Sequence, residues 1–307
     1  QVLQCFGDHR VRISSLSMTQ IEGFVRKWFQ YIYTAESGLD VKTAEEVIGE
    51  IKAHPSVSEL LQTPLMLTAV CILYHTGGRL PEQRADLYKK FVDNLIFRRF
   101  DDPEKVISFL MLLAFTMHTQ KTREFGRTDA LKVMPAVYGR DRDETDVQYD
   151  LRLDQKYTAV EQNCGLLKFE KGHYEFWHLS FQEFLAARYL VEFGTRHAET
   201  MDNYWNLDWY QEMVELFIGY LSIQSRGQAH EIIREKLNGA DRSPYRSRRL
   251  AARCLLDIHK DVRLQDVVAR ARERLVSIID HGGGPTVLAD AGEILGWLGD
   301  PRNLEAF

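Results

Sequence analysis

His178 is the residue in this sequence that is best placed to do chemistry. It lies where an aromatic stretch, Tyr174–Trp177, runs almost directly into an amphipathic stretch, Ser180–Leu190. A neutral imidazole donates one hydrogen bond and accepts another, and an imidazolium pairs well with phosphate. At such a junction a side chain can meet a ligand outside the local core, or it can cap the helix that follows. The residue types by themselves leave both roles open.

The sequence contains none of the common motifs for catalysis or phosphate binding. Glycine-rich phosphate loops, paired-histidine zinc motifs and nucleophile elbows are absent. Gly282–Pro285 is a linker with no lysine and no preceding strand. The cysteines fit no zinc spacing, so we expect reduced, buried thiols and no metal site. They are Cys5, Cys71, Cys164 and Cys254. We therefore expect no enzymatic activity from this chain by itself.

Composition narrows the class of protein. The chain has 307 residues, of which 45% are apolar and 27% charged, with a net charge of −5. This length allows two or three domains, and the charge gives no overall attraction to nucleic acid or membrane. No run of 18 apolar residues occurs, so we expect a cytoplasmic protein without a membrane span. The strand-like start Val2–Phe6, after Gln1, suggests a piece of a longer polypeptide.

The first hundred residues are expected to form a helical domain. A helical stripe runs through Thr19–Ile32, with Thr19 or Ser17 as N-cap and Glu22 completing a capping box with Thr19. Further helices are expected at about 43–53, 65–74 and 82–100. Pro64 stands at the first position of the helix at 65–74, where its missing N–H costs nothing, although a functional role could coexist with that position.

The next segment has the order of a winged helix. Helices are expected at about 104–120 and 127–134, then a charged loop at 139–146 and a helix at 157–163. Residues 166–178 alternate about a Lys171–Gly172 turn and predict a β-hairpin. A winged helix can bind DNA. The candidate recognition helix, however, offers only Lys156 as a cation and Glu161 opposes it, so we do not expect nucleic acid binding here.

The remaining residues predict an α-solenoid of HEAT-like units. Helices are expected at about 209–223, 228–237, 246–259, 264–280 and 285–298, joined by short loops. Residues 226–274 contain 13 Lys or Arg against 7 Asp or Glu. Four arginines cluster on one expected helix, which forms either a solvated face or a docking surface for an acidic protein or nucleic acid. They are Arg246, Arg248, Arg249 and Arg253.

Three segments resemble a known family. Leu16 with Ile21–Phe29, the stretch Thr63–Tyr88, and above all Phe176–Leu190 are similar to the C-terminal half of bacterial NACHT-type STAND NTPases, which are relatives of the animal NLR immune receptors. The resemblance covers about residues 10–195. It implies the end of the NTPase core or a linker at 1–15, a helical domain at 16–102, a winged helix at 103–195 and HEAT-like repeats at 196–307.

The resemblance also implies a ligand. In this family ATP or ADP lies between the NTPase core and these domains, with a proline against the base and a winged-helix histidine on the β-phosphate of ADP. These residues correspond to Pro64 and His178. The Walker A and Walker B segments and the sensor arginine are absent from this sequence. Hydrolysis therefore belongs to the full-length parent as an ATPase, and we expect no nucleotide bound to this chain alone.

The function that follows is a regulatory and sensor-relay part of a signalling switch. Its partners would be its own upstream NTPase core and a protein partner or oligomer of the parent, without membrane. A role in bacterial antiviral defence rests on family analogy. Two alternatives stay open from the residues: a helical-repeat scaffold for protein interaction without nucleotide-dependent activity, and a nucleic-acid-binding module.

Overall fold

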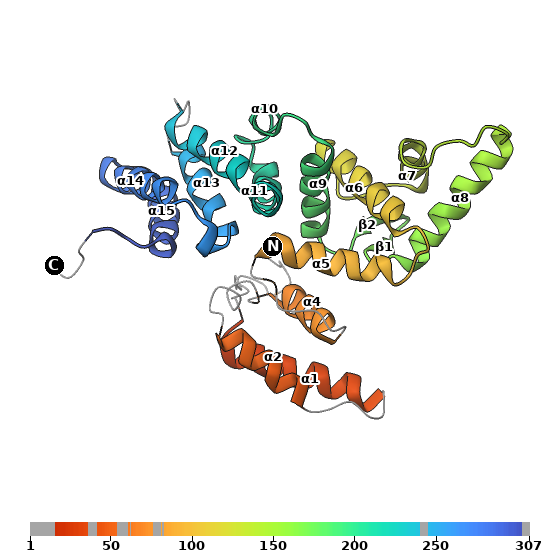
Figure 1. Ribbon diagram of the computed structural model, residues 1–307, viewed down its shortest axis with the longest axis horizontal. Coiled ribbons are helices and arrows are strands. Elements are labelled where there is room, and N and C mark those ends of the chain that lie inside the picture. Colours follow the sequence, from red (N-terminus) through yellow and green to blue (C-terminus); the bar gives the residue numbers. More distant parts are fainter. Residues whose placement is uncertain are drawn as a thin grey trace, which may run out of the picture. The chain divides into compact units, whose positions relative to one another are not determined.

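The computed structural model describes residues 16–35, 42–53, 61, 63–75, 81, 83–239 and 245–302 (Figure 1). The chain divides into two compact units, residues 1–82 and 83–307, and each is described by itself. The described residues are mainly helical with one small sheet, which confirms the expected fold class. The predicted strand at Val2–Phe6 lies outside them. Among them, no helix is long and apolar enough to cross a membrane.

In the described part of the first unit, α1 (Met18–Ala35), α2 (Lys42–Ala53) and α4 (Pro64–His75) pack on one another. Ser17 caps α1, since its Oγ accepts from the Gln20 N–H and the Gln20 side chain accepts from the Ser17 N–H at 2.8 Å. The predicted capping box of Thr19 with Glu22 is therefore wrong. Glu22 instead pairs across the unit with Lys52 of α2 at 2.8 Å, a contact that local sequence cannot reveal.

The second unit begins with α5 (Arg84–Phe97) and continues in winged-helix order. The elements are α6 (Pro103–Thr119), α7 (Arg127–Val133), α8 (Asp146–Asn163), β1 (Leu167–Glu170), β2 (His173–Phe176) and α9 (Leu179–Phe193). The predicted hairpin is confirmed: its strands pair antiparallel, and Lys171 and Gly172 both have positive φ, as the tightest hairpin turns require. Because α5 belongs to this unit, the unit boundary differs from the predicted domain end at residue 102; the domain boundaries stay predictions.

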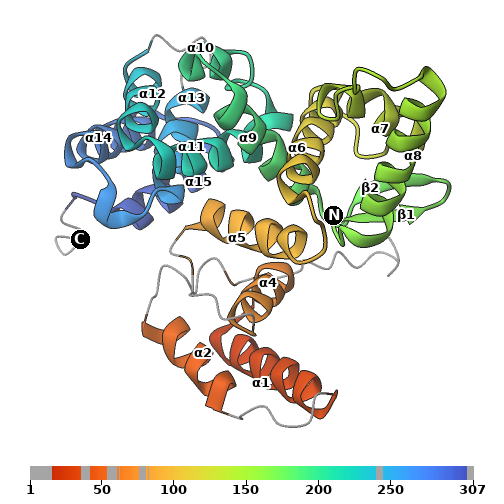
Figure 2. The same ribbon diagram turned by 45° about the vertical axis from the view of Figure 1, so that its right-hand side comes forward.

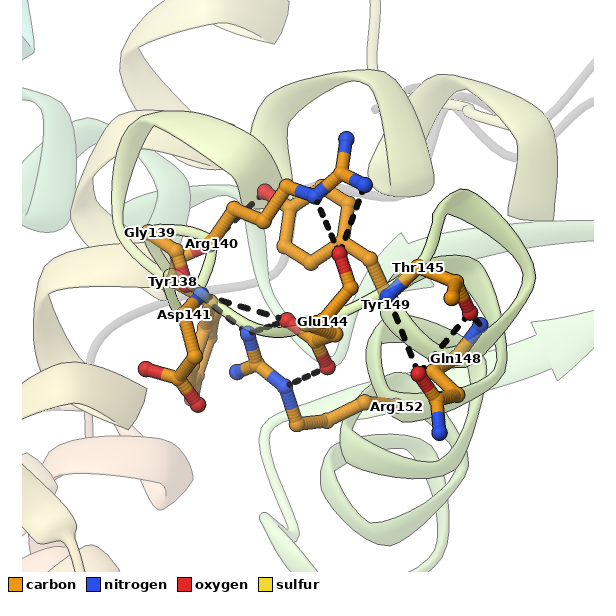
Figure 3. Close-up of polar contacts among 9 residues, drawn as sticks. All are labelled: Tyr138, Gly139, Arg140, Asp141, Glu144, Thr145, Gln148, Tyr149 and Arg152. Carbon is orange, nitrogen blue, oxygen red and sulfur yellow. Dashed lines mark hydrogen bonds and ion pairs between the residues drawn. The ribbon is translucent and has the colours of Figure 1, made fainter.

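The predicted helix at 157–163 is too short, because α8 already begins at Asp146. Thr145 and Gln148 form a capping box at its start. Figure 3 shows the hydrogen bonds that order residues 139–145, the connector before α8. Arg152 of α8 donates two hydrogen bonds of 2.8 Å to the Glu144 carboxylate, and the Arg140 guanidinium donates to the Glu144 carbonyl. These bonds turn a sequence that reads as a charged loop into a fixed helix entry.

The N-terminal turns of α8 make this helix more acidic than expected from the sequence, which bears on nucleic acid binding. The added turns bring three aspartates and one arginine to the helix that a DNA-binding winged helix would insert in a groove. The aspartates are Asp146, Asp150 and Asp154. Arg152 forms an ion pair with Glu144, and Arg127 of α7 forms one with Asp154 at 2.8 Å. An acidic helix repels phosphate, so its charge does not favour DNA.

The C-terminal helices form a stack. They are α10 (His197–Asp202), α11 (Gln211–Gln224), α12 (Arg226–Asn238), α13 (Arg246–Cys254), α14 (Gln265–His281) and α15 (Pro285–Leu298). From α11 onward each helix packs on the next and on the next but one, as stacked helical repeats do. Their HEAT-like character stays a prediction. The sequence missed α10, and it extended α13 to residue 259, whereas the α-helix ends at Cys254 and a 3₁₀ turn, η4 (Leu255–Asp257), follows.

The thiols that can be placed are buried. Cys71, Cys164 and Cys254 are free and buried, as expected, while Cys5 lies outside the described residues. Burial raises the pKa of Cys71 to about 12, so this thiol stays protonated and unreactive at neutral pH. Within the described part of the chain, no group of three or more His, Cys, Asp or Glu side chains could hold a metal ion.

A charged cluster fixes α5 to the C-terminal helices. Arg84, the first residue of α5, binds both carboxylate oxygens of Asp257 at 2.8 and 3.1 Å. The same guanidinium reaches Glu212 at 2.5 Å and Glu215 at 3.3 Å, both on α11. We call these four residues the Arg84 cluster. Three carboxylates face one cation, and burial, followed by the charges of Asp257 and Glu212, raises the pKa of Glu215 to about 8.

We therefore expect the chain to lose stability as pH rises. Glu215 keeps its proton up to about pH 8 in the folded chain, whereas in the unfolded chain it loses the proton near the ordinary pKa of a glutamate. The contribution of Glu215 to the free energy of unfolding is therefore complete at low pH and declines up to about pH 8. Glu215→Gln imitates the protonated side chain. It should have nearly the stability of the wild type at about pH 4 and be more stable by several kcal/mol at about pH 8.5, measured by urea unfolding.

Glu235→Gln is the control, because Glu235 is exposed on α12. It should leave the pH profile unchanged. A Glu215→Gln profile that runs parallel to the wild type over this range would show that Glu215 titrates normally.

Candidate functional site

His178 is the N-cap of α9. Its backbone is extended (φ −143°, ψ 142°), and its Nδ1 accepts a hydrogen bond from the Ser180 N–H at 3.2 Å. The Ser180 hydroxyl lies 2.8 Å from the same nitrogen. The contact satisfies one of the N–H groups that every helix leaves free in its first turn. The capping interpretation of His178 is thus confirmed.

The cap also fixes the chemistry of the other ring nitrogen. Because Nδ1 accepts from a backbone N–H, it carries no proton, and the hydrogen-bond network assigns the neutral ring as the Nε2–H tautomer. No partner for Nε2 is found among the described residues, and His178 is exposed. The ring therefore presents one N–H donor to the surroundings of α9. Partial burial, and next the positive charge of Arg123, lower the pKa of His178.

Arg123 is the residue that sequence analysis missed. The preceding carbonyl, that of Thr122, accepts a hydrogen bond at 2.8 Å from the side chain of Gln182, one turn into α9. This bond places Arg123 beside the start of α9, near His178. The Arg123 guanidinium also lies over the ring of Trp209, 5.7 Å from its centroid. No local pattern marks Arg123, because the residues that position it come from distant parts of the chain.

Glu183 connects this site with the interior. It lies on α9 and is only 8% exposed. Burial, and next the charge of Glu212, raise the pKa of Glu183 to about 7, while Arg84 and Arg123 act in the opposite direction. Glu183 is thus within electrostatic reach of both Arg123 and the Arg84 cluster. Charged groups follow one another from the exposed start of α9 to the buried junction of α5 and α11.

Pro64 is the first residue of α4 and is exposed. The Thr63 hydroxyl accepts from the Met66 N–H at 3.4 Å, so Thr63 caps the helix and Pro64 occupies the position where its missing N–H costs nothing. That structural interpretation is confirmed. Pro64 belongs to the first unit and His178 to the second, and each unit is described by itself. A contact of Pro64 with a base stays a prediction.

The four arginines of α13 are engaged mostly within the chain. Arg249 pairs with Asp290 of α15 at 2.8 Å, and Arg253 contacts the same carboxylate. Arg246 contacts Asp208, and among the described residues Arg248 makes a long contact, 3.5 Å, with the Gly239 carbonyl. These bonds hold neighbouring helices together, so they do not favour a docking surface at these arginines. Docking of an acidic partner or nucleic acid stays a prediction.

Comparison with known proteins identifies part of the second unit. Residues 97–190 match the family model of a winged helix-turn-helix domain C-terminal to NACHT. No curated protein matches the chain. The matched segment runs from the end of α5 into α9 and contains both Arg123 and His178. It confirms the predicted winged helix, which is not a catalytic core, and supports the resemblance to the C-terminal part of a NACHT-type protein.

Two substitutions of His178 test its capping role, because one keeps a helix-capping side chain and the other does not. Asparagine is among the best N-caps, whereas alanine offers no acceptor. We expect His178→Ala to lower the free energy of unfolding by about 1 kcal/mol and His178→Asn to retain most of it. Urea unfolding at pH 7.5 measures both. Equal losses for the two variants would contradict the capping role.

The cap should also respond to pH. The pKa of His178 is lower in the folded chain than in the unfolded chain, so the unfolded chain is protonated first as pH falls. The contribution of His178 to the free energy of unfolding is therefore present above about pH 6.5 and is lost as pH falls below it. The His178→Asn chain should lose less stability than the wild type between pH 7.5 and 5.5. Parallel profiles would mean that His178 titrates alike in the folded and unfolded states.

Proposed function

We propose, from the premise that residues 97–190 are a winged-helix domain that follows a NACHT core, that this chain is the regulatory part of a NACHT-type nucleotide switch. In it, the Nε2–H of His178 donates a hydrogen bond to the terminal phosphate of bound ADP and stabilises the closed, inactive state. The observation that carries the proposal is the Nε2–H donor of an exposed ring, which has no partner among the described residues and whose other nitrogen is fixed by the α9 cap.

The residues present fit a phosphate group. The tautomer and orientation of the His178 ring are already fixed, so its N–H can donate a hydrogen bond to phosphate without first losing conformational freedom. The N-terminal end of α9 also favours negative charge. No acidic residue stands in the first turn of α9. Bound nucleotide would supply the phosphate, and Pro64 in the first unit is the residue proposed to contact the base. Hydrolysis is assigned to the parent core and to no residue of this chain.

The contact can report nucleotide state because α9 is firmly packed. Its side chains from Ser180 to Arg188 are buried, and it contacts α5, α6 and α11. Phe181, one turn after His178, stacks on Phe91 of α5 with ring centroids 5.5 Å apart. A ligand that holds the start of α9 in one state more tightly than in another shifts the equilibrium between them by that difference. The shift then reaches α11 and the helices stacked on it.

The test uses the full-length protein that contains the NACHT core. Loss of one hydrogen bond to a charged phosphate should speed ADP release about tenfold in both His178→Asn and His178→Ala, because both lack Nε2. Dissociation of a fluorescent ADP analogue measures the rate. The same variants should raise basal oligomerisation, which light scattering follows.

His173→Asn is the matched control, because His173 is exposed on β2 and lies outside the cap. It should release ADP at the wild-type rate. His178→Asn provides the decisive outcome, since it keeps the cap: wild-type ADP release from this variant would refute the proposed contact.

A further inference from the structure

Arg123 is an exposed cation in a segment whose backbone is anchored. Among the residues that the structure describes, Arg123 forms no ion pair, although it is exposed and free to find one. The backbone around it is held on both sides. The Gln182 side chain binds the Thr122 carbonyl, and Phe125 exchanges two hydrogen bonds of 2.9 Å with Tyr174 of β2. These bonds fix the backbone at Arg123 between α9 and β2.

Its surroundings concentrate positive charge. The bond from Gln182 of α9 to the Thr122 carbonyl puts Arg123 beside the start of α9, where its charge, after partial burial, lowers the pKa of His178. The N-terminal end of α9 adds a partial positive charge. The acidic group nearest along α9, Glu183, is buried and has its pKa raised to about 7, so it is only partly ionised at neutral pH. An arginine that forms no ion pair among the described residues, together with an imidazole N–H donor, is suited to bind an anion.

The position of the Arg123 side chain connects this site with the C-terminal helices. Its guanidinium lies over Trp209, which belongs to η3 (Asp208–Tyr210) directly before α11. Trp209 is itself fixed, because its Nε1 donates to the His118 carbonyl of α6 at 2.9 Å and its ring stacks on His118. The guanidinium therefore rests on a rigid platform formed by the winged helix and the C-terminal region together.

We infer that Arg123 is a second phosphate contact, which acts with His178 on the same phosphoryl group and transmits its presence to α11 through Trp209. The inference rests on the proposed function of His178 and adds a residue to it. An arginine gives two parallel N–H donors in a fixed plane, which suits phosphate oxygens, while its face stays on the indole. The side chain can thus hold the phosphate and Trp209 at the same time.

The main experiment measures ADP release from the full-length protein with its NACHT core. Arg123→Gln should speed release about tenfold, as expected for loss of a charge-assisted hydrogen bond. Arg123→Lys should fall between Arg123→Gln and the wild type, because it keeps the charge and loses the planar fork. Each single variant increases the rate of ADP release by some factor. In the double variant Arg123→Gln/His178→Asn, the increase should be smaller than the product of these two factors, because both residues hold the same phosphate.

Arg142→Gln is the matched control, an exposed arginine in the connector before α8. It should release ADP like the wild type. If His178→Asn speeds release and Arg123→Gln does not, the inference about Arg123 is wrong and the proposed function stands. If neither variant changes release, the proposed function itself is wrong.

A second measurement needs no nucleotide. In this 307-residue chain, the ring protons of His178 report its pKa by NMR titration. Arg123→Gln should raise that pKa, because it removes the positive charge that lowers it, and Arg123→Lys should leave it nearly unchanged. A His178 pKa that is the same in Arg123→Gln and wild type would place the two side chains too far apart to share a phosphate, and would overturn the inference.

Discussion

The second unit depends on the burial of one helix, α9. Figures 1 and 2 both show it between α6 and α11, and α5 packs against it as well. A helix enclosed in this way must satisfy its own polar side chains inside the protein. Arg188 does so by binding Asp93 of α5 and Glu192, each at 2.7 Å, and Tyr220 of α11 donates to the same Glu192. The winged helix and the helical stack therefore share a core and polar contacts, rather than meeting at a loose surface.

Charge adds a second constraint at the same junction. Arg84 is opposed by three carboxylates, and Glu183 stands near them with a raised pKa. Buried ion pairs bring little net stability, because desolvation offsets most of the attraction, but removing one partner is costly. The arrangement therefore specifies how α5, α11 and η4 fit together more than it strengthens the fold. It also makes the junction sensitive to any change that alters the charge near α9.

The candidate site shows how one residue can serve two roles without conflict. The two nitrogens of His178 have different roles: Nδ1 accepts from the first turn of α9, and Nε2 has no partner among the described residues. The structural role fixes the tautomer and the orientation that the proposed binding role needs. Capping and binding are thus not competing explanations, and the cap is what makes the donor preorganised.

The sequence by itself determined the features that depend on near neighbours. Helical periodicity, the positive-φ turn at Lys171–Gly172 and the strand-to-helix junction at His178 all follow from residues a few positions apart, so they were predictable. Local sequence failed at α8, where Arg152 and Arg140 order a connector that its charges mark as a loop. The same holds for the position of Arg123, which distant residues decide.

Only the tertiary structure decided which charges meet. Arg84 finds Asp257 across 173 positions of the chain, and Arg246 of the basic helix finds Asp208 across 38. A charged residue has many partners of opposite sign available in the sequence, and packing selects among them. For that reason the sequence identified His178 as a candidate, whereas its neighbour Arg123 and the connection through Trp209 emerged only from the fold.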